Sequence, residues 1–146
     1  MSMNSGRPVH LQVRFLSVVV LGGMVGVAAR EGLILATPET EVPWVIFGIN
    51  VVGAFILGFL LDALARTGPD TGVRRMVRLG CGTGILGGFT TYSALATDTA
   101  RLTSEGSAWG VGYAVLSLVV GLVAALVGMR VATSIRPGRG DVEVEA

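Results

Sequence analysis

Four long apolar stretches decide which class of fold is open to this chain. They run from about 15 to 36, 42 to 65, 77 to 97 and 109 to 129, and each is close to the roughly 20 residues that a helix needs to cross a hydrocarbon core. A mean hydropathy of +0.71 and a charged fraction of 14% exclude a soluble domain of 146 residues. We therefore expect a single all-α membrane domain over residues 1–146, with four transmembrane helices.

The third stretch contains an interruption. Residues 80–97 read GCGTGILGGFTTYSALAT, with five glycines followed by several hydroxyl-bearing side chains. A broken helix persists at membrane depth only where other groups satisfy the backbone that it frees. If Gly87-Gly88 and Thr90-Thr91 leave helical geometry, their carbonyls can bind a small cation. The hydroxyls of Thr90, Thr91 and Ser93 and the ring edge of Tyr92 suit an anion instead. We expect the functional site at this break.

The arginines are distributed unevenly between the two sides of the expected bundle. Both termini and the middle turn share one side, which carries nine arginines: Arg7, Arg14, Arg66, Arg74, Arg75, Arg78, Arg130, Arg136 and Arg139. The other two turns contribute only Arg101. The positive-inside rule therefore predicts that both termini lie in the cytoplasm. We expect a multi-pass protein of the cell inner (plasma) membrane. The tail, residues 136–146, ends in DVEVEA and is expected to be disordered.

Three other spans carry isolated polar side chains. Asn50 lies near the centre of the second span, where it serves either as interhelical glue or as an NH2 donor to an anion. Tyr113 and Ser117 share one face of the fourth span, although a serine in a membrane helix commonly bonds to its own i−4 carbonyl. Arg30, in the first span beside Glu31, is either an interfacial anchor or part of an anion entrance.

The spans contain no arrangement typical of catalysis. No carboxylate pair, His/Cys cluster or nucleophile with a base lies within them, and His10 stands alone in the polar head. Cys81 is the only cysteine, and its apolar surroundings suggest a packing role. We therefore expect neither an enzyme nor a nucleic-acid partner.

Three ordered motifs carry a resemblance to a known family. GGMVGVAAR in the first span is similar to GGxxGAxxR, INVVGAFILGF in the second to VNxxGxFxxGF, and GILGGFTTYS in the third to GxxGGxTTFS. On these motifs the sequence resembles the Fluc/CrcB fluoride channels, small four-span proteins that act as antiparallel dimers of dual-topology type. The resemblance implies a fluoride-specific channel subunit that passively exports fluoride and so lowers its cytoplasmic concentration.

The resemblance also implies roles for particular residues. A structural, non-transported sodium ion is expected at the dimer centre, bound by the backbone carbonyls of Gly87 and Thr90. Arg30 and Asp98 are expected at a pore mouth, Asp98 in place of a family glutamate. The expected fluoride path comprises Asn50, Thr91, Tyr92, Ser93, Leu95, Tyr113 and Ser117. Fluoride is strongly hydrated, so a dehydrating pore must replace its lost water with donors of this kind.

Four positions depart from the family pattern. Tyr92 and Leu95 stand where two phenylalanines line the family's fluoride path, Ile46 replaces a threonine, and Glu31 replaces an aromatic residue. A bias of nine arginines to one should also fix the chain in a single orientation, which is difficult to reconcile with an antiparallel homodimer. We therefore expect an antiparallel dimer with an oppositely oriented paralogue that supplies the missing lining.

Two alternative functions remain at this point. The chain is a non-conducting or regulatory partner subunit of a heterodimeric fluoride channel if its altered lining closes its own path. A small multidrug exchanger is also a four-span membrane protein, but it depends on a glutamate deep in the first span. Here the first half of that span has no acid, and Glu31 lies near its end. The exchanger is therefore the weaker alternative.

Overall fold

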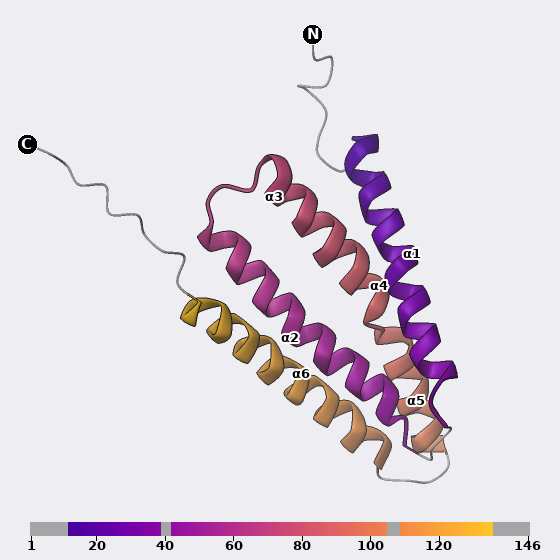
Figure 1. Cartoon of the computed structure of the whole chain (residues 1–146). Coiled ribbons are helices and arrows are strands. Elements are labelled where there is room, and N and C mark those ends of the chain that lie inside the picture. Colours follow the sequence, from indigo (N-terminus) through magenta and orange to yellow (C-terminus); the bar gives the residue numbers. More distant parts are fainter. Residues whose placement is uncertain (1–11, 39–41, 105–108, 136–146) are drawn as a thin grey trace, which may run out of the picture.

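The computed structural model describes residues 12–38, 42–104 and 109–135, and the described chain is helical throughout apart from short turns (Figure 1). Within these residues, three helices are long and apolar enough to cross a membrane: α1 (Val13–Leu35), α2 (Trp44–Arg66) and α6 (Trp109–Ser134). Their bounds lie close to those expected from the sequence for the first, second and fourth spans. The all-α membrane fold is therefore confirmed.

The third span is assembled from four consecutive pieces. These are α3 (Gly72–Val77), the π-helical segment η2 (Arg78–Leu86), α4 (Gly87–Phe89) and, beyond a break, α5 (Tyr92–Ser104). The helical path therefore begins five residues before the expected start at 77 and ends seven residues after the expected end at 97. Wide π turns are frequently found at functional sites, and here they lead directly to the break.

The break lies at Thr90 and Thr91. Thr90 adopts an extended backbone, with φ −79° and ψ 154°, whereas Gly87 keeps helical angles of −66° and −33°. Gly87 and Gly88 begin α4, so the expectation that the glycine pair also leaves helical geometry is wrong. Both glycines can adopt helical angles at modest cost. The change of direction falls instead on the two threonines, whose backbone groups find partners elsewhere.

Glycines allow the helices to approach one another closely. α1 packs against η2 and α4, α2 against α6, and α5 against α6. A Cβ atom added at Gly26 would collide with the Ile85 carbonyl oxygen, and one at Gly22 would lie 3.1 Å from Gly84 Cα. The GxxxG spacing of Gly22 and Gly26 thus serves helix packing, as it commonly does in membranes. Gly58 and Gly128 play the same part between α2 and α6.

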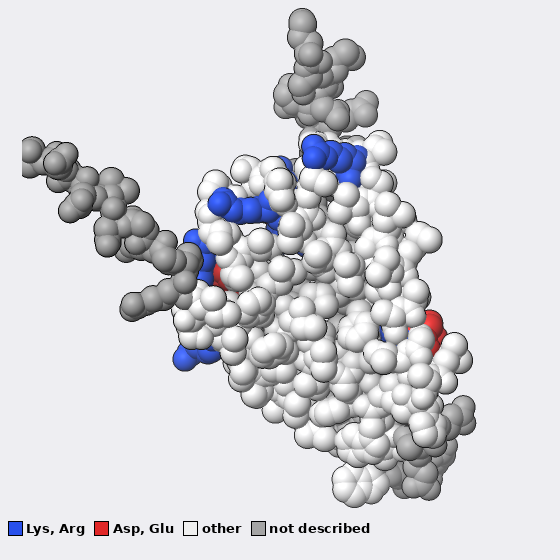
Figure 2. All heavy atoms as spheres, in the orientation of Figure 1, with Lys and Arg blue, Asp and Glu red and all other residues white. Residues whose placement is uncertain are grey.

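Most of the described arginines lie at one end of the bundle. The start of α1, the α2–α3 turn and the end of α6 lie at this end in Figure 1, and most of the blue surface in Figure 2 lies there as well. Arg7, Arg136, Arg139 and the expected disordered tail fall outside the described residues. The described part of the chain therefore has the up-and-down course that four spans require.

The turn at the arginine-rich end contains a compact ion-pair network. The carboxylate of Asp70 accepts hydrogen bonds from Arg78 Nε at 3.0 Å and from Arg78 Nη2 at 2.7 Å. Arg75 Nε lies 3.5 Å from the same carboxylate. The Arg78 hydrogen bonds, aided by the charges of both arginines, lower the pKa of Asp70 below its ordinary value. The turn satisfies its charges with groups from its own chain.

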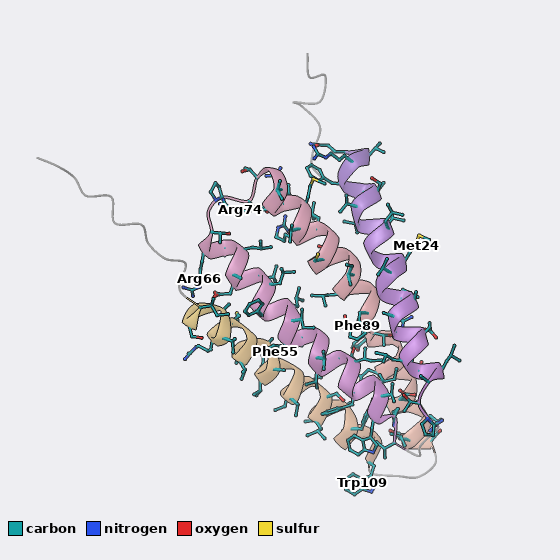
Figure 3. All side chains as sticks on the ribbon, viewed as in Figure 1. Met24, Phe55, Arg66, Arg74, Phe89 and Trp109 are labelled. Carbon is teal, nitrogen blue, oxygen red and sulfur yellow. The ribbon has the colours of Figure 1, made fainter. Side chains whose placement is uncertain are left out.

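The chain buries little apolar surface. No large side chain of the described residues is fully buried, and the one compact cluster consists of Leu95, Leu102 and Tyr113 between α5 and α6. Met24 on α1 and Trp109 on α6 point away from the bundle (Figure 3). Outward apolar side chains are the normal surface of a membrane helix that meets lipid or another subunit.

Candidate functional site

Asn50 on α2 binds the broken backbone through both ends of its amide. Its Oδ1 accepts the backbone N–H of Thr91 at 2.8 Å, and its Nδ2 donates to the Thr91 carbonyl at 3.1 Å. The interhelical alternative for Asn50 is therefore observed. An amide nitrogen carries two hydrogens, so one hydrogen beyond the Thr91 bond remains to serve a further acceptor.

This pairing frees the carbonyl of Gly87. In a continuous helix the N–H of Thr91 would bond to the oxygen of Gly87, four residues earlier. Here that N–H points to Asn50, while the N–H and the hydroxyl of Thr90 both donate to the Leu86 oxygen, at 2.9 and 2.8 Å. Gly87 is exposed, and a Cβ atom there would meet nothing within 4 Å. Its backbone therefore lies on an open surface without its helical donor.

Thr91 also caps the start of α5. Its hydroxyl oxygen accepts the N–H of Ala94 at 3.1 Å and lies 3.2 Å from the hydroxyl of Ser93. This is the geometry of an N-cap, in which a side-chain oxygen satisfies an unpaired N–H of the first turn. Because Ala94 would otherwise bond to Thr90, the Thr90 carbonyl also loses its helical donor. The two carbonyls expected to bind sodium are thus both released by named side chains.

A groove joins α2, the break and α6. Its volume is about 340 Å³. It is lined by Asn50, Gly53, Ala54, Leu57, Thr90, Thr91, Tyr92, Leu95, Ser117, Leu118, Gly121 and Leu122. Five of the seven residues expected on the fluoride path thus meet in one place. Ser93 and Tyr113 do not line the groove, although each touches a residue that does.

Gly53 is a groove residue whose role the sequence analysis missed. A Cβ atom at this position would collide with the methyl group of Thr90. Gly53 follows Asn50 by three residues, so both lie on the face of α2 that meets the break. The N-x-x-G spacing within the second-span motif was the available signal, because a side chain at Gly53 would push the break away from the Asn50 amide.

The two positions that depart from the family's phenylalanines differ in burial. Tyr92 is 78% exposed, whereas Leu95 is only 6% exposed and packs with Leu102 and Tyr113. Leu95 therefore contributes to the core of this chain as well as to the groove wall. The Tyr92 ring, in contrast, reaches beyond the chain, where lipid alone could not satisfy its hydroxyl.

The hydroxyls of α6 already have acceptors. Tyr113 donates to the Pro43 carbonyl at 3.3 Å, and Ser117 donates to the Tyr113 carbonyl at 2.7 Å. Both side chains are buried, at 4% and 5% exposure. The i−4 alternative for Ser117 is therefore observed. Each hydroxyl must therefore rotate away from its carbonyl before it can donate to an anion.

The two residues expected at a pore mouth lie in different surroundings. Asp98 lines a second cavity of about 430 Å³, together with Arg101, Thr37 and residues of the α1–α2 connection. Its Oδ2 atom is inaccessible and has no hydrogen-bond partner among the described residues. Arg30 does not line this cavity and instead contacts the broken span, where its Nη1 donates to the Gly88 carbonyl at 3.3 Å.

The described helices form a multi-pass membrane protein, with three long apolar spans and a third span along the chain that is broken within its length. The groove at this break presents amide and hydroxyl groups and is a candidate site for an ion. Residues 17–129 match the family model described as CrcB-like protein, Camphor Resistance (CrcB), and the chain belongs to this family.

Curated relatives cover nearly the whole chain. A protein of Leifsonia xyli subsp. xyli named "Fluoride-specific ion channel FluC 2" is 49% identical over 142 residues, which is 96% of this chain and 98% of the relative. "Fluoride-specific ion channel FluC 1" of Cutibacterium acnes is 44% identical over 87% of this chain and 90% of its own. "Fluoride-specific ion channel FluC" of Novosphingobium aromaticivorans is 38% identical over 82% and 94%. The family resemblance in the three motifs is confirmed.

Proposed function

We propose that this chain is a subunit of a fluoride-specific channel that exports fluoride passively and lowers its cytoplasmic concentration. The observation that carries the proposal is the groove at the break, where Asn50, the Thr91 cap and the first turn of α5 converge. The names of the relatives supply the ion. The proposal involves no catalytic step, because a channel only lowers the barrier for an ion to move down its gradient.

The groove has the chemistry that a small dehydrated anion requires. Asn50 has one amide hydrogen beyond its Thr91 bond, and the Thr91 and Ser93 hydroxyls share one hydrogen bond, which leaves the second proton free. The N-terminal end of α5 adds partial positive charge. Among the described residues that line the groove, none is an acid, so the anion meets donors without a competing carboxylate.

The break also fits a structural sodium ion. The carbonyls of Gly87 and Thr90 are hard oxygen ligands without helical donors, and Gly87 faces an open surface. We propose that these two oxygens bind the ion and that a second chain supplies further ligands at the dimer centre. A bound cation would add positive charge near the anion path. In this proposal the sodium is structural and is not transported.

The second chain is proposed to be an antiparallel paralogue. Tyr92 is 78% exposed and Gly87 faces outward, so the site is half open in a single chain. Nine arginines on one side favour a single orientation, with both termini in the cytoplasm. In this proposal the protein lies in the inner (plasma) membrane of the cell. The numbered names of the L. xyli and C. acnes relatives agree with more than one family member in an organism.

Fluoride efflux from liposomes tests the proposal. The purified chain is reconstituted alone and together with its candidate paralogue, and efflux is followed with a fluoride electrode against chloride as the control anion. We expect fluoride-selective efflux from the mixed preparation and little from the chain alone. Chloride permeation equal to that of fluoride would contradict the selectivity, and full efflux from the chain alone would contradict the heterodimer.

A non-conducting partner subunit is the second candidate. Two observations favour it: the hydroxyls of Tyr113 and Ser117 are both bonded to carbonyls, and Leu95 has no ring to offer an anion. Asn50→Ala in this chain alone distinguishes the two roles in the mixed channel. Lost flux from mixed channels that still assemble, as judged by crosslinking, assigns a conducting path to this chain, whereas unchanged flux assigns it to the partner. The multidrug exchanger is disfavoured because Glu31 is paired with Arg30.

A further inference from the structure

Arg30 and Glu31 form a bridge between α1 and the end of α4. Arg30 Nη1 donates to the carbonyl oxygen of Gly88 at 3.3 Å. The Nε and Nη2 atoms of Arg30 both donate to Glu31 Oε1, at 3.2 and 3.0 Å. Gly88 lies two residues before Thr90, so the guanidinium connects the first span with the last turn before the break.

The geometry of a guanidinium explains what the carboxylate adds. The group is planar and directs its donors along fixed lines. Once Glu31 holds the edge that carries Nε and Nη2, the plane is fixed and Nη1 can point in only one direction. That direction leads to Gly88. The Arg30 side chain is 20% exposed, so this charge-assisted contact is weakened less by solvent than a fully exposed pair.

The pairing is not a default feature of a helix. Adjacent helical residues point in different directions and do not normally face each other. Arg30 therefore has to fold back toward Glu31, which itself remains 51% exposed. An acid at position 31 thus draws the guanidinium into one conformation, whereas an aromatic side chain would leave the same guanidinium free to reach other acceptors.

The Gly88 carbonyl is a suitable target for this bridge. Its helical donor would be the N–H of Tyr92, which lies across the break at the start of α5. Gly88 also packs so closely on α1 that an added Cβ atom would collide with the Gly23 carbonyl. A donor from α1 therefore binds the oxygen at a point where the two segments already touch.

We propose that Glu31 is a positioning residue that orients Arg30, so that the guanidinium holds the Gly88 carbonyl on α1 while the neighbouring Gly87 carbonyl stays free on the open face. Peptide planes beside a break can rotate, because the regular helical hydrogen bonds no longer fix their orientation. The hydrogen bond from Arg30 to the Gly88 carbonyl therefore also restricts the orientation of the neighbouring Gly87 carbonyl. Its consequence for ion flux rests on the proposed channel function, whereas its consequence for the Gly88 carbonyl does not.

Carbonyl NMR of selectively labelled protein in lipid tests the positioning step directly. The chain contains two Gly-Phe pairs, Gly58-Phe59 and Gly88-Phe89, so ¹³C-carbonyl glycine with ¹⁵N-phenylalanine yields two signals, one of them an internal control. We expect the Gly88 signal to move upfield in Glu31→Ala and in Arg30→Lys, and the Gly58 signal to stay in place. Glu31→Gln keeps an acceptor oxygen and should fall between. A Gly88 signal that is unchanged in both Glu31→Ala and Arg30→Lys overturns the proposal.

Fluoride flux supplies the functional arm. Glu31→Ala and Arg30→Lys should each lower flux about tenfold, the factor expected for loss of one charge-assisted hydrogen bond. The double variant should be no worse than Arg30→Lys, because both changes remove the same contact. Asp62→Asn is the matched control, since it breaks the Arg66 ion pair at the other end of the bundle. All flux measurements use the mixed preparation with the paralogue. A wild-type mixture that conducts, together with a Glu31→Ala mixture of equal flux, overturns the positioning role. A wild-type mixture that does not conduct overturns only the channel function.

Discussion

The α2–α3 turn and the break in the third span both leave the helix, but they satisfy their polar groups in opposite ways. At the turn, Asp70 is bound by Arg75 and Arg78 from the same chain. At the break, Asn50 and Thr91 satisfy each other, while two carbonyls and the exposed Tyr92 hydroxyl are left to other partners. The turn is complete within one chain, and the break is not.

The difference follows from the surroundings of the two regions. Charged side chains at the end of a bundle meet water and headgroups, so the gain from pairing them is small. Within the hydrocarbon core, an unpaired backbone N–H or C=O group costs on the order of several kcal/mol, because it has lost its hydrogen bonds to water. The break therefore persists because particular side chains replace water, and changes there should have larger effects than changes at the turn.

Asn50→Ala should have the largest effect. It removes both hydrogen bonds to Thr91 and leaves a buried N–H and C=O without partners, which should cost roughly 2–4 kcal/mol of stability. A rearrangement that instead returns the Thr91 N–H to the Gly87 oxygen would reduce this loss of stability but would occupy the carbonyl that we assign to sodium. Denaturation in mixed micelles and fluoride efflux measure the two effects.

Thr133→Ala is the control for Asn50→Ala. The Thr133 hydroxyl also bonds to a backbone carbonyl, but within its own helix and at an exposed position. Its loss leaves no buried group unpaired, so stability and flux should stay near the wild-type values. Equal losses in the two variants would show that the break depends on hydrogen bonds no more than an ordinary helix end does.

Gly26→Ala and Gly87→Ala separate packing within the chain from assembly between chains. A Cβ atom at Gly26 collides with the Ile85 carbonyl, so Gly26→Ala should destabilise the single chain by about 1–3 kcal/mol. A Cβ atom at Gly87 meets nothing within 4 Å, so Gly87→Ala should leave the single chain folded and weaken only the dimer. Thermal unfolding and crosslinking of the assembled channel measure these effects.

The sequence predicted the features that depend on local composition. Four apolar runs gave the spans, the glycine and threonine content gave the position of the break, and GxxxG gave the α1 packing face. It assigned the break to Gly87-Gly88 as well, because glycine content alone does not show whether a residue leaves helical geometry. Both glycines are helical, but only Gly88 packs closely on α1, a contact that the assembled fold alone reveals.

The state of each polar group was harder to predict. The sequence left both alternatives open for Asn50 and Ser117, since the choice depends on which acceptor the tertiary fold brings within reach. Asn50 meets the Thr91 backbone across the bundle, and Ser117 finds the nearer Tyr113 carbonyl. Arg30, for which a pore mouth was expected, contacts the Gly88 carbonyl and the Glu31 carboxylate. Long-range contacts of this kind have no signature in spacing.

Tyr92→Phe should have a smaller effect than Asn50→Ala or Gly26→Ala. The Tyr92 side chain is 78% exposed and lies at the open end of the break, so loss of its hydroxyl should not change the stability of the single chain. If a partner supplies an acceptor, flux through the assembled channel should fall a few-fold, as for loss of one neutral hydrogen bond of about 1 kcal/mol. Efflux that is unchanged would place Tyr92 against lipid or apolar protein.

The turn should respond least, and its response should depend on pH. Because its arginine partners lower the pKa of Asp70 in the folded state, the ionised carboxylate contributes its full stabilisation at any pH above the ordinary aspartate pKa. That contribution is lost as the pH falls through the lowered pKa. Asp70→Asn should therefore lower the melting temperature only slightly at pH 7, and its difference from the wild type should disappear in strong acid. Since the network lies far from the break, Asp70→Asn should also leave fluoride flux unchanged. A large loss of flux would show that the turn and the break act as one unit, which is contrary to the difference between them.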